Sequence, residues 1–286
     1  MSNWYVFAIF ALILLGFQRF LYKVSAERKC NTAWTTFSFM ATVAILSSTL
    51  FVVLGESVSD ITFLFFIALV NSGAFLVATI THIEALKHIP TSVAYPIIRL
   101  NAVVVVIFSI LYFKDRLSLY QGIGIVLALA VIVILALGIS DNNAPQKNIR
   151  RGFIFVVIAL FGGAVAAISS KFAAGNTNKM AFIAVSYIAS TLFSFGLRKK
   201  LQTEETHKMH KDALIIGVIM GLINFAGYYS FLKALSTGPL SIIASITGMH
   251  FVISIILSAI IYKEKLTPLR ISGIFLTVLS IILLRL

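Results

Sequence analysis

Long blocks of apolar residues follow one another along nearly the whole chain, and this feature constrains the fold most. Hydrophobic residues fill 59% of the 286 positions and charged residues only 12%, whereas soluble globular chains carry about 25% charged residues. About 20 mostly apolar residues are needed to cross the hydrocarbon layer of a bilayer. The sequence therefore predicts an all-α integral membrane protein, because a β-barrel would show shorter alternating segments.

Short connections rich in charge, Pro, Asn and Gly separate the apolar blocks, and such residues end helices. They divide the chain into ten predicted transmembrane helices, at residues 4–22, 32–54, 61–86, 91–112, 118–138, 152–172, 179–197, 213–235, 240–262 and 268–285. The polar segment SDNNAPQKNIRR lies near the midpoint and predicts a linker. We expect a first five-helix repeat over residues 1–138, a linker over 139–151 and a second repeat over 152–286.

The net charge of +13 lies in the connections between spans, so anionic lipid headgroups are the expected partner, and not nucleic acid. The single cysteine, Cys30, excludes an internal disulfide and a thiolate metal site. His207 and His210 lack further ligands, so no metal is expected, and nothing calls for a cofactor. The sequence has no HExxH, GxSxG or Walker motif, which argues against an enzyme. We expect a multi-pass protein of a cell membrane, plasma or bacterial inner.

One corner occurs twice in the sequence. LYFKDRLSLYQGIG and IIYKEKLTPLRISG align without gaps at an offset of 149 residues, which places Lys114 on Lys263 and Asp115 on Glu264. The two corners are five spans apart, and an odd number of crossings puts them on opposite sides of the membrane. The sequence therefore predicts two inverted five-helix repeats, an arrangement that suits alternating access around a site near the midplane.

These repeated segments resemble the EamA-type branch of the drug/metabolite transporter superfamily. The likeness is carried by ALKHIPTSVAYPIIRL and YFKDRLSLYQGIGIVLALAVIVIL, and by ALSTGPLSIIASITGMHFVIS and YKEKLTPLRISGIFLTVLSIILL. Asp115 departs from the Glu that the family has in this corner. The resemblance implies a central cavity, export or exchange of small organic solutes such as amino acids, and cytoplasmic termini. The Lys and Arg residues, concentrated in the odd-numbered connections, predict the opposite orientation.

Arg99, inside the fourth span, is the sharpest candidate for substrate binding. An ionisable residue inside a span costs about 2.5–3.5 kcal/mol on insertion scales, so it faces protein or a water-filled cavity. Arg99 is expected to bind a substrate carboxylate or phosphate, with Tyr95 one turn earlier on the same face. The alternatives are an internal ion pair or a side chain that reaches the interface. Pro96 predicts a kink in the same span.

Asn101 aligns with His250 at the same offset, so a polar residue occupies one position of the fourth span in both halves. His250 is a candidate proton carrier or substrate hydrogen-bond donor, or else a packing histidine. Asn224 and Tyr228 recur at helical spacing in the eighth span and predict a polar wall. A tyrosine near a membrane boundary is otherwise an interface anchor.

His82 and Glu84 come late in the third span. His82 is a candidate substrate-binding residue, and Glu84 is the candidate for proton coupling. Glu84 alternatively lies in the headgroup region and pairs with Lys87 or His88. Gln18 and Arg19, late in the first span, are candidates to face a vestibule, and anchoring to lipid is the favoured prediction for Arg19.

Gly217 and Gly221 form a GxxxG pattern, which lets helices approach closely. We interpret it as packing within the chain.

Together these features predict a secondary transporter of small organic solutes, with protons as the candidate coupling ion. Two alternatives stay open. One is an intramembrane enzyme that uses His82, Glu84 or His250 for acid–base chemistry. The other is a non-transporting receptor or assembly subunit.

Overall fold

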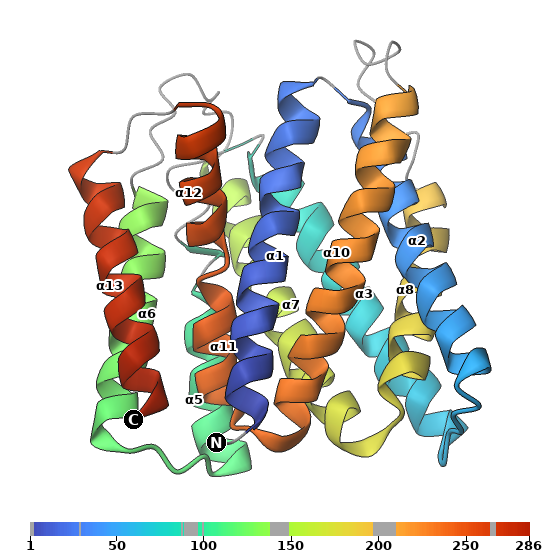
Figure 1. Cartoon of the computed structure of the whole chain (residues 1–286), viewed down its shortest axis with the longest axis horizontal. Helices are drawn as coiled ribbons and strands as arrows, with labels where there is room; N and C mark the ends of the chain where they lie inside the picture. The colour runs from blue at the N-terminus through green and yellow to red at the C-terminus, as the bar shows by residue number, and fades with distance from the viewer. Residues whose placement is uncertain are drawn as a thin grey trace.

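The computed structural model describes residues 3–28, 30–86, 88, 97–98, 100–137, 149–196, 210–263 and 267–286. Within these ranges every regular element is helical, and the helices stand side by side as a bundle (Figure 1). The first half consists of α1 (Asn3–Glu27), α2 (Thr32–Val53), α3 (Ile61–Leu86), α5 (Asn101–Phe108), the π-helical turn η1 (Ser109–Phe113) and α6 (Leu119–Leu137). The second half consists of α7 (Ile149–Asn176), α8 (Lys179–Gly196), α10 (His210–Thr237), α11 (Leu240–Gly248), α12 (Phe251–Ile261) and α13 (Pro268–Arg285).

Seven helical segments of the described chain are long and apolar enough to cross a membrane. Three shorter apolar segments, Asn101–Phe113, Leu119–Ile134 and Ile271–Arg285, lie where the fourth, fifth and tenth spans were predicted. Large apolar side chains such as Phe66, Val126 and Phe275 are exposed, and a surface of this kind suits contact with lipid. The prediction of an all-α, multi-pass membrane protein is confirmed. The predicted linker lies almost entirely outside the described residues.

The two halves pack against each other throughout the bundle. Helix α1 packs on α10, and α3 packs on α7. Helices α1 and α7 are the first spans of their halves, and α3 and α10 are the third spans. Both contacts therefore join the first span of one half to the third span of the other. The contacts of α1 with α12 and of α7 with α5 are related in the same way. Helix α6 packs on α13, which runs in the opposite direction (Figure 1).

Both fourth spans are interrupted at the same place in the repeat. Between α11 and α12, the N–H of Met249 bonds to the carbonyl of Ile246 at 3.1 Å, three residues back and not four. Leu100 makes the same bond to Ile97 at 3.1 Å, 149 residues earlier. A tight turn inside a helix marks a local break in the helical ladder. The predicted kink residue, Pro96, lies outside the described residues.

The repeated corners share one backbone conformation. Lys114 and Lys263 both have a φ of 53°, and they are the non-glycine residues with positive φ in the described chain. The corner after η1 lies at the end of the bundle that holds both termini, and the corner after α12 lies at the opposite end (Figure 1).

A lysine from the first span of each half packs over an aromatic residue beside the other half's corner. The Nζ of Lys171 lies 5.7 Å from the ring centroid of Phe113. The Nζ of Lys23 lies 5.2 Å from that of Tyr262. Phe113 and Tyr262 are 149 residues apart, so one contact occurs twice with the halves exchanged.

The GxxxG glycines pack α10 against α2, as predicted. A Cβ atom on Gly221 would lie 2.6 Å from the Cβ of Thr42 and 3.0 Å from the carbonyl oxygen of Phe39. A Cβ on Gly217 would lie 2.7 Å from the carbonyl oxygen of Thr35. Two adjacent backbones therefore meet where a side chain would not fit.

Gly221→Ala is expected to lower the free energy of unfolding by about 1–3 kcal/mol, the usual cost of overpacking. Gly73→Ala is the matched control, because its Cβ would meet nothing within 4 Å and both changes gain the same helix propensity. The midpoint of thermal unfolding can be followed in detergent with a fluorogenic maleimide. The thiol of Cys30 is 4% exposed, and burial raises its pKa, so it reacts only on unfolding. Equal midpoints for the two variants would contradict the close packing.

Candidate functional site

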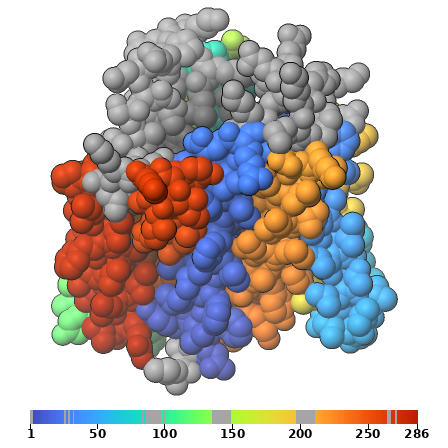
Figure 2. All heavy atoms as spheres, turned by 45° about the horizontal axis from the view of Figure 1, so that its top comes forward, coloured from blue at the N-terminus to red at the C-terminus, as the bar shows by residue number. Residues whose placement is uncertain are grey.

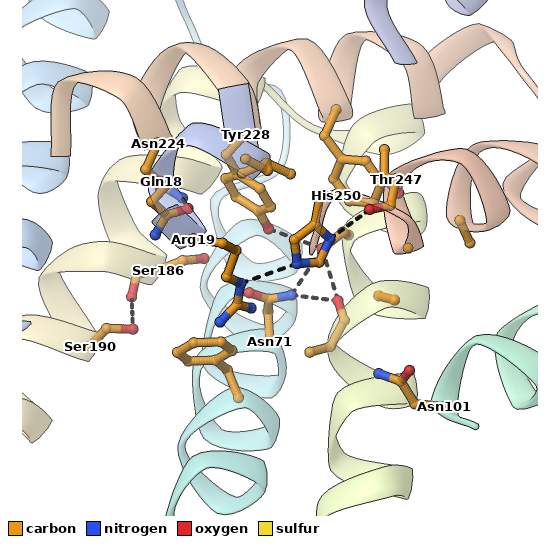
Figure 3. Close-up of a pocket in the computed structure, with 18 of the residues that line it drawn as sticks. Gln18, Arg19, Asn71, Asn101, Ser186, Ser190, Asn224, Tyr228, Thr247 and His250 are labelled. Carbon is orange, nitrogen blue, oxygen red and sulfur yellow. Dashed lines mark hydrogen bonds between the residues drawn. The ribbon is translucent and has the colours of Figure 1, made fainter. Parts of the chain in front are cut away.

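A cavity of about 320 Å³ lies between the two halves, beside the break between α11 and α12. This volume is at the lower end of the range for small-molecule sites, about 300–1,000 Å³. Its polar side chains are Gln18, Arg19, Asn71, Asn101, Ser170, Ser186, Ser190, Asn224, Thr247 and His250 (Figure 3). Its larger apolar and aromatic side chains are Leu15, Tyr22, Phe39, Met40, Phe75, Val105, Tyr187, Tyr228 and Phe231.

Arg19 reaches the cavity because α1 lies close to the break between α11 and α12. A Cβ on Gly16, one turn earlier in α1, would lie 2.8 Å from the carbonyl oxygen of His250 and 2.5 Å from the Cβ of Ile253. This close approach brings the Nε of Arg19 to 3.1 Å from the Nε2 of His250. The guanidinium also lies 5.6 Å from the ring centroid of Tyr22. In Figure 2, α1 separates α12 and α13 from α10 on the visible face.

The hydrogen bonds of His250 define its protonation. Its Nδ1 lies 2.6 Å from the carbonyl oxygen of Thr247. A carbonyl oxygen only accepts, so Nδ1 carries the proton and Nε2 offers a lone pair to the Nε–H of Arg19. His250 is therefore neutral in this arrangement, and toward Arg19 it is an acceptor.

Asn224 joins three helices in the wall of the cavity. It is 5% exposed, its Nδ2 donates to the Oε1 of Gln18 at 2.9 Å, and its Oδ1 accepts from the hydroxyl of Tyr187 at 2.6 Å. These bonds link α10 to α1 and α8. Because lipid offers no alternative partners, such a network fixes the rotation of each helix about its axis.

Asn71 forms a second network, between α3 and α7. Its Nδ2 donates to the carbonyl oxygen of Ala166 at 2.7 Å and to the hydroxyls of Ser169 at 2.9 Å and Ser170 at 3.1 Å. The Ser170 hydroxyl in turn lies 2.9 Å from the hydroxyl of Tyr228. The cavity wall is thus cross-linked by neutral polar groups from both halves.

Two other polar groups of the lining have no hydrogen bond to the described part of the chain. One is the carboxamide of Asn101 at the start of α5. The other is the hydroxyl of Ser186, whose residue is only 3% exposed. The Asn101 carboxamide is suited to contact a bound molecule, whereas the Ser186 hydroxyl is enclosed by protein in this conformation.

The structure brings together part of the predicted site. Four of the predicted substrate-binding residues line the cavity: Asn101, Asn224, Tyr228 and His250. Tyr95 and Arg99 lie outside the described residues, so their roles stay predictions.

His82 and Glu84 are half-buried near the end of α3 and are not among the described lining residues. Glu84 lies just beyond the apolar stretch, which ends at His82. The substrate-binding role of His82 and the proton-coupling role of Glu84 stay predictions.

Gln18 and Arg19 both line the cavity. The favoured prediction that Arg19 anchors the chain to lipid is therefore wrong, and the alternative that both residues face a vestibule agrees with the structure. Sequence reasoning also missed Asn71, Ser186 and Tyr187. The available signal for Arg19 was Gly16, one turn earlier, which marks the helix face that approaches another backbone. Asn71, Ser186 and Tyr187 are polar residues in apolar spans, and nothing in the neighbouring sequence indicated which helix face they occupy.

The comparisons with known proteins decide the family. The model of the EamA-like transporter family matches residues 2–137 and 150–286. The chain belongs to the EamA-like transporter family. A relative from Archaeoglobus fulgidus, named an uncharacterized transporter, is 24% identical over 216 residues, which cover 74% of this chain and 72% of the relative.

One solved crystal structure shares the fold of this EamA-like protein. It is 14% identical, has a TM-score of 0.79, and the match covers 100% of this chain and 99% of the other. The family, the relative and the apolar helices together identify a multi-pass membrane protein of transporter type.

Asn224→Ala is expected to lower the free energy of unfolding by about 1–3 kcal/mol, because the buried Gln18 carboxamide loses its donor and the half-buried Tyr187 hydroxyl loses its acceptor. The control is Asn176→Ala, an exposed residue whose Nδ2 donates to a carbonyl of its own helix at 2.9 Å. Thermal unfolding monitored at Cys30 measures both. Equal shifts would show that the Asn224 network contributes nothing specific.

Proposed function

We propose that this protein is a secondary active transporter, an exporter or exchanger of small organic solutes, and that it works by alternating access between two inverted five-helix repeats. The observation that carries the proposal is the recurrence of contacts, with the halves exchanged, on either side of a central cavity. Opposed repeats of this kind can exchange conformations around a fixed midplane site.

Several independent features support inverted repeats. The helix breaks at Leu100 and Met249 and the left-handed corners at Lys114 and Lys263 share one offset of 149 residues. The corners lie at opposite ends of the bundle, and α6 and α13 run in opposite directions (Figure 1). The family model also matches each half separately.

Asp115 joins the halves at the end of the bundle that holds the termini. Its Oδ2 accepts from the Ser241 hydroxyl at 2.7 Å, from the Ser241 N–H at 3.1 Å and from the Ser109 hydroxyl at 2.5 Å. The Ser241 N–H lies in the first turn of α11, which has no side-chain cap from Pro239. Asp115 therefore caps a helix of the other half, and its negative charge suits the positive helix N-terminus. We call Asp115, Ser109 and Ser241 the Asp115 latch.

The repeat supplies a counterpart to this latch. The residues equivalent to Asp115 and Ser241 are Glu264 and Ser92, which lie outside the described residues. In the proposed cycle, the Asp115 latch closes the end that holds the termini in one state and is released in the other. The cavity then opens to one face at a time, and a solute shifts the balance only if it binds the two states differently.

Alternating access can be tested with a single cysteine in the cavity, Ser190→Cys, in a Cys30→Ser background. We expect a membrane-impermeant maleimide to label it from either face of sealed vesicles, because each state opens the cavity to one side. Val126→Cys is the control, since this residue is 65% exposed on an apolar helix and a thiol in lipid should not react from either face. Labelling of Ser190→Cys from one face only would support a receptor or enzyme, and free ion conduction would support a channel.

Loss of the latch is expected to change the balance of states. In the Ser190→Cys background, Asp115→Asn should raise labelling from the face that carries the termini by about tenfold and lower it from the other face. Hydrogen bonds to a charged group contribute about 1.5–3 kcal/mol, and 1.4 kcal/mol is a factor of ten. Asp115→Glu should restore the balance.

The control for the latch is Asp60→Asn. Asp60 caps its own helix, because its Oδ1 accepts from the N–H of Phe63 at 2.8 Å, so its loss should not favour either face. If Asp115→Asn changed labelling equally from both faces, the Asp115 latch would be a purely structural contact.

A further inference from the structure

We infer that the transported solute is a small monocarboxylate with an apolar body, and that Arg19 binds its carboxylate. This inference deepens the proposed transport function and rests on it. It is carried by the arrangement of charge and hydrogen-bonding groups in the cavity.

Arg19 is a permanent cation within an apolar span, Asn3–Ser25. A charge there is costly unless it meets water or an anion. No carboxylate of the described chain pairs with Arg19. The ion pair between described residues joins Arg28 to Asp212 at 3.7 Å, and neither of these residues lines the cavity. The Arg19 side chain is instead exposed and lines the cavity. A bound anion would supply the missing counter-charge.

The guanidinium is held in an orientation that suits a carboxylate. Its Nε is engaged by His250 at 3.1 Å, and its plane lies near the ring of Tyr22. Its two Nη groups make no hydrogen bond to the described residues, and together they offer the fork that binds both oxygens of a carboxylate. Figure 3 shows Arg19 directed into the space beside His250 and Asn71. Because neighbours already fix the fork, little freedom is lost on binding.

The rest of the lining sets the remaining chemistry of the solute. The described lining residues include no Asp or Glu, so an ammonium group would find no counter-charge among them. This favours a monocarboxylate over an amine or a zwitterionic amino acid. The rings of Phe39, Phe75 and Phe231 offer an apolar wall for a hydrocarbon body. The carboxamide of Asn101 can bond a neutral polar substituent.

The test compares acids with their primary amides on the purified full-length protein. The pairs are acetate and acetamide, butyrate and butyramide, benzoate and benzamide, and 3-phenylpropionate and its amide, with phenylalanine as the zwitterion. Thermal unfolding followed at Cys30 reports binding, because a ligand stabilises the folded state according to its concentration over its Kd. We expect at least one acid to raise the midpoint in a saturable way, and its amide and phenylalanine to have less effect.

Substitutions at Arg19 test whether this residue binds the acid. Arg19→Gln should weaken acid binding by about tenfold or more, the worth of a charge-assisted hydrogen bond. Arg19→Lys should retain part of it, since it keeps the charge and loses the fork. Arg28→Gln is the control, because Arg28 is an exposed cation outside the cavity. The inference would be overturned if no acid raised the midpoint of thermal unfolding, or if each amide raised it as much as its acid. It would also be overturned if the effect of an acid were unchanged in Arg19→Gln.

Failure of this inference and failure of the proposed function give different results. If acids bind through Arg19 but Ser190→Cys is labelled from one face only, the transport proposal is contradicted and the anion site is supported. Labelling of Ser190→Cys from both faces without acid binding would support the transport proposal and contradict the inference that the solute is a monocarboxylate. The comparison of acids with amides uses the unaltered protein, so it holds even if Arg19→Gln does not fold.

Discussion

A bilayer offers no hydrogen-bond partners to polar groups, and the rest of this structure depends on that constraint. Backbone groups are satisfied within helices, and polar side chains either bond back to their own helix or turn toward one another inside the bundle. Asn71 and Asn224 show the second solution, since each joins two or more helices through its amide. Several of the remaining polar groups line the cavity, and large apolar side chains such as Phe66, Val126 and Phe275 face outward.

The broken fourth spans give the cavity its functional groups. The break at Met249 lies beside the point where Gly16 of α1 comes close to the carbonyl of His250. Arg19 follows one turn later and meets the His250 ring. The close approach of α1 to the start of α12, at Gly16, thus brings the cation of Arg19 to the cavity.

Charge is used in two different ways along the same molecule. In the cavity, Arg19 has no carboxylate partner within the described chain and is open to an anion from outside. At the end that holds the termini, the Oδ2 of Asp115 accepts three hydrogen bonds and links the first half to the start of α11. The first arrangement suits a site that binds and releases a solute. The second suits a contact that opens and closes, and the repeat supplies an equivalent acid, Glu264, in the other half.

The sequence by itself determined the class of fold, the order of the helices and the family, because apolar blocks and a repeat at constant offset are local signals that packing does not alter. It also placed Asn101, Asn224, Tyr228 and His250 at the cavity, because polar residues inside spans turn away from lipid. Only the tertiary structure decided that Arg19 belongs with them. Its neighbour His250 is 231 residues away, and which face of α1 meets the cavity depends on how closely two backbones can approach.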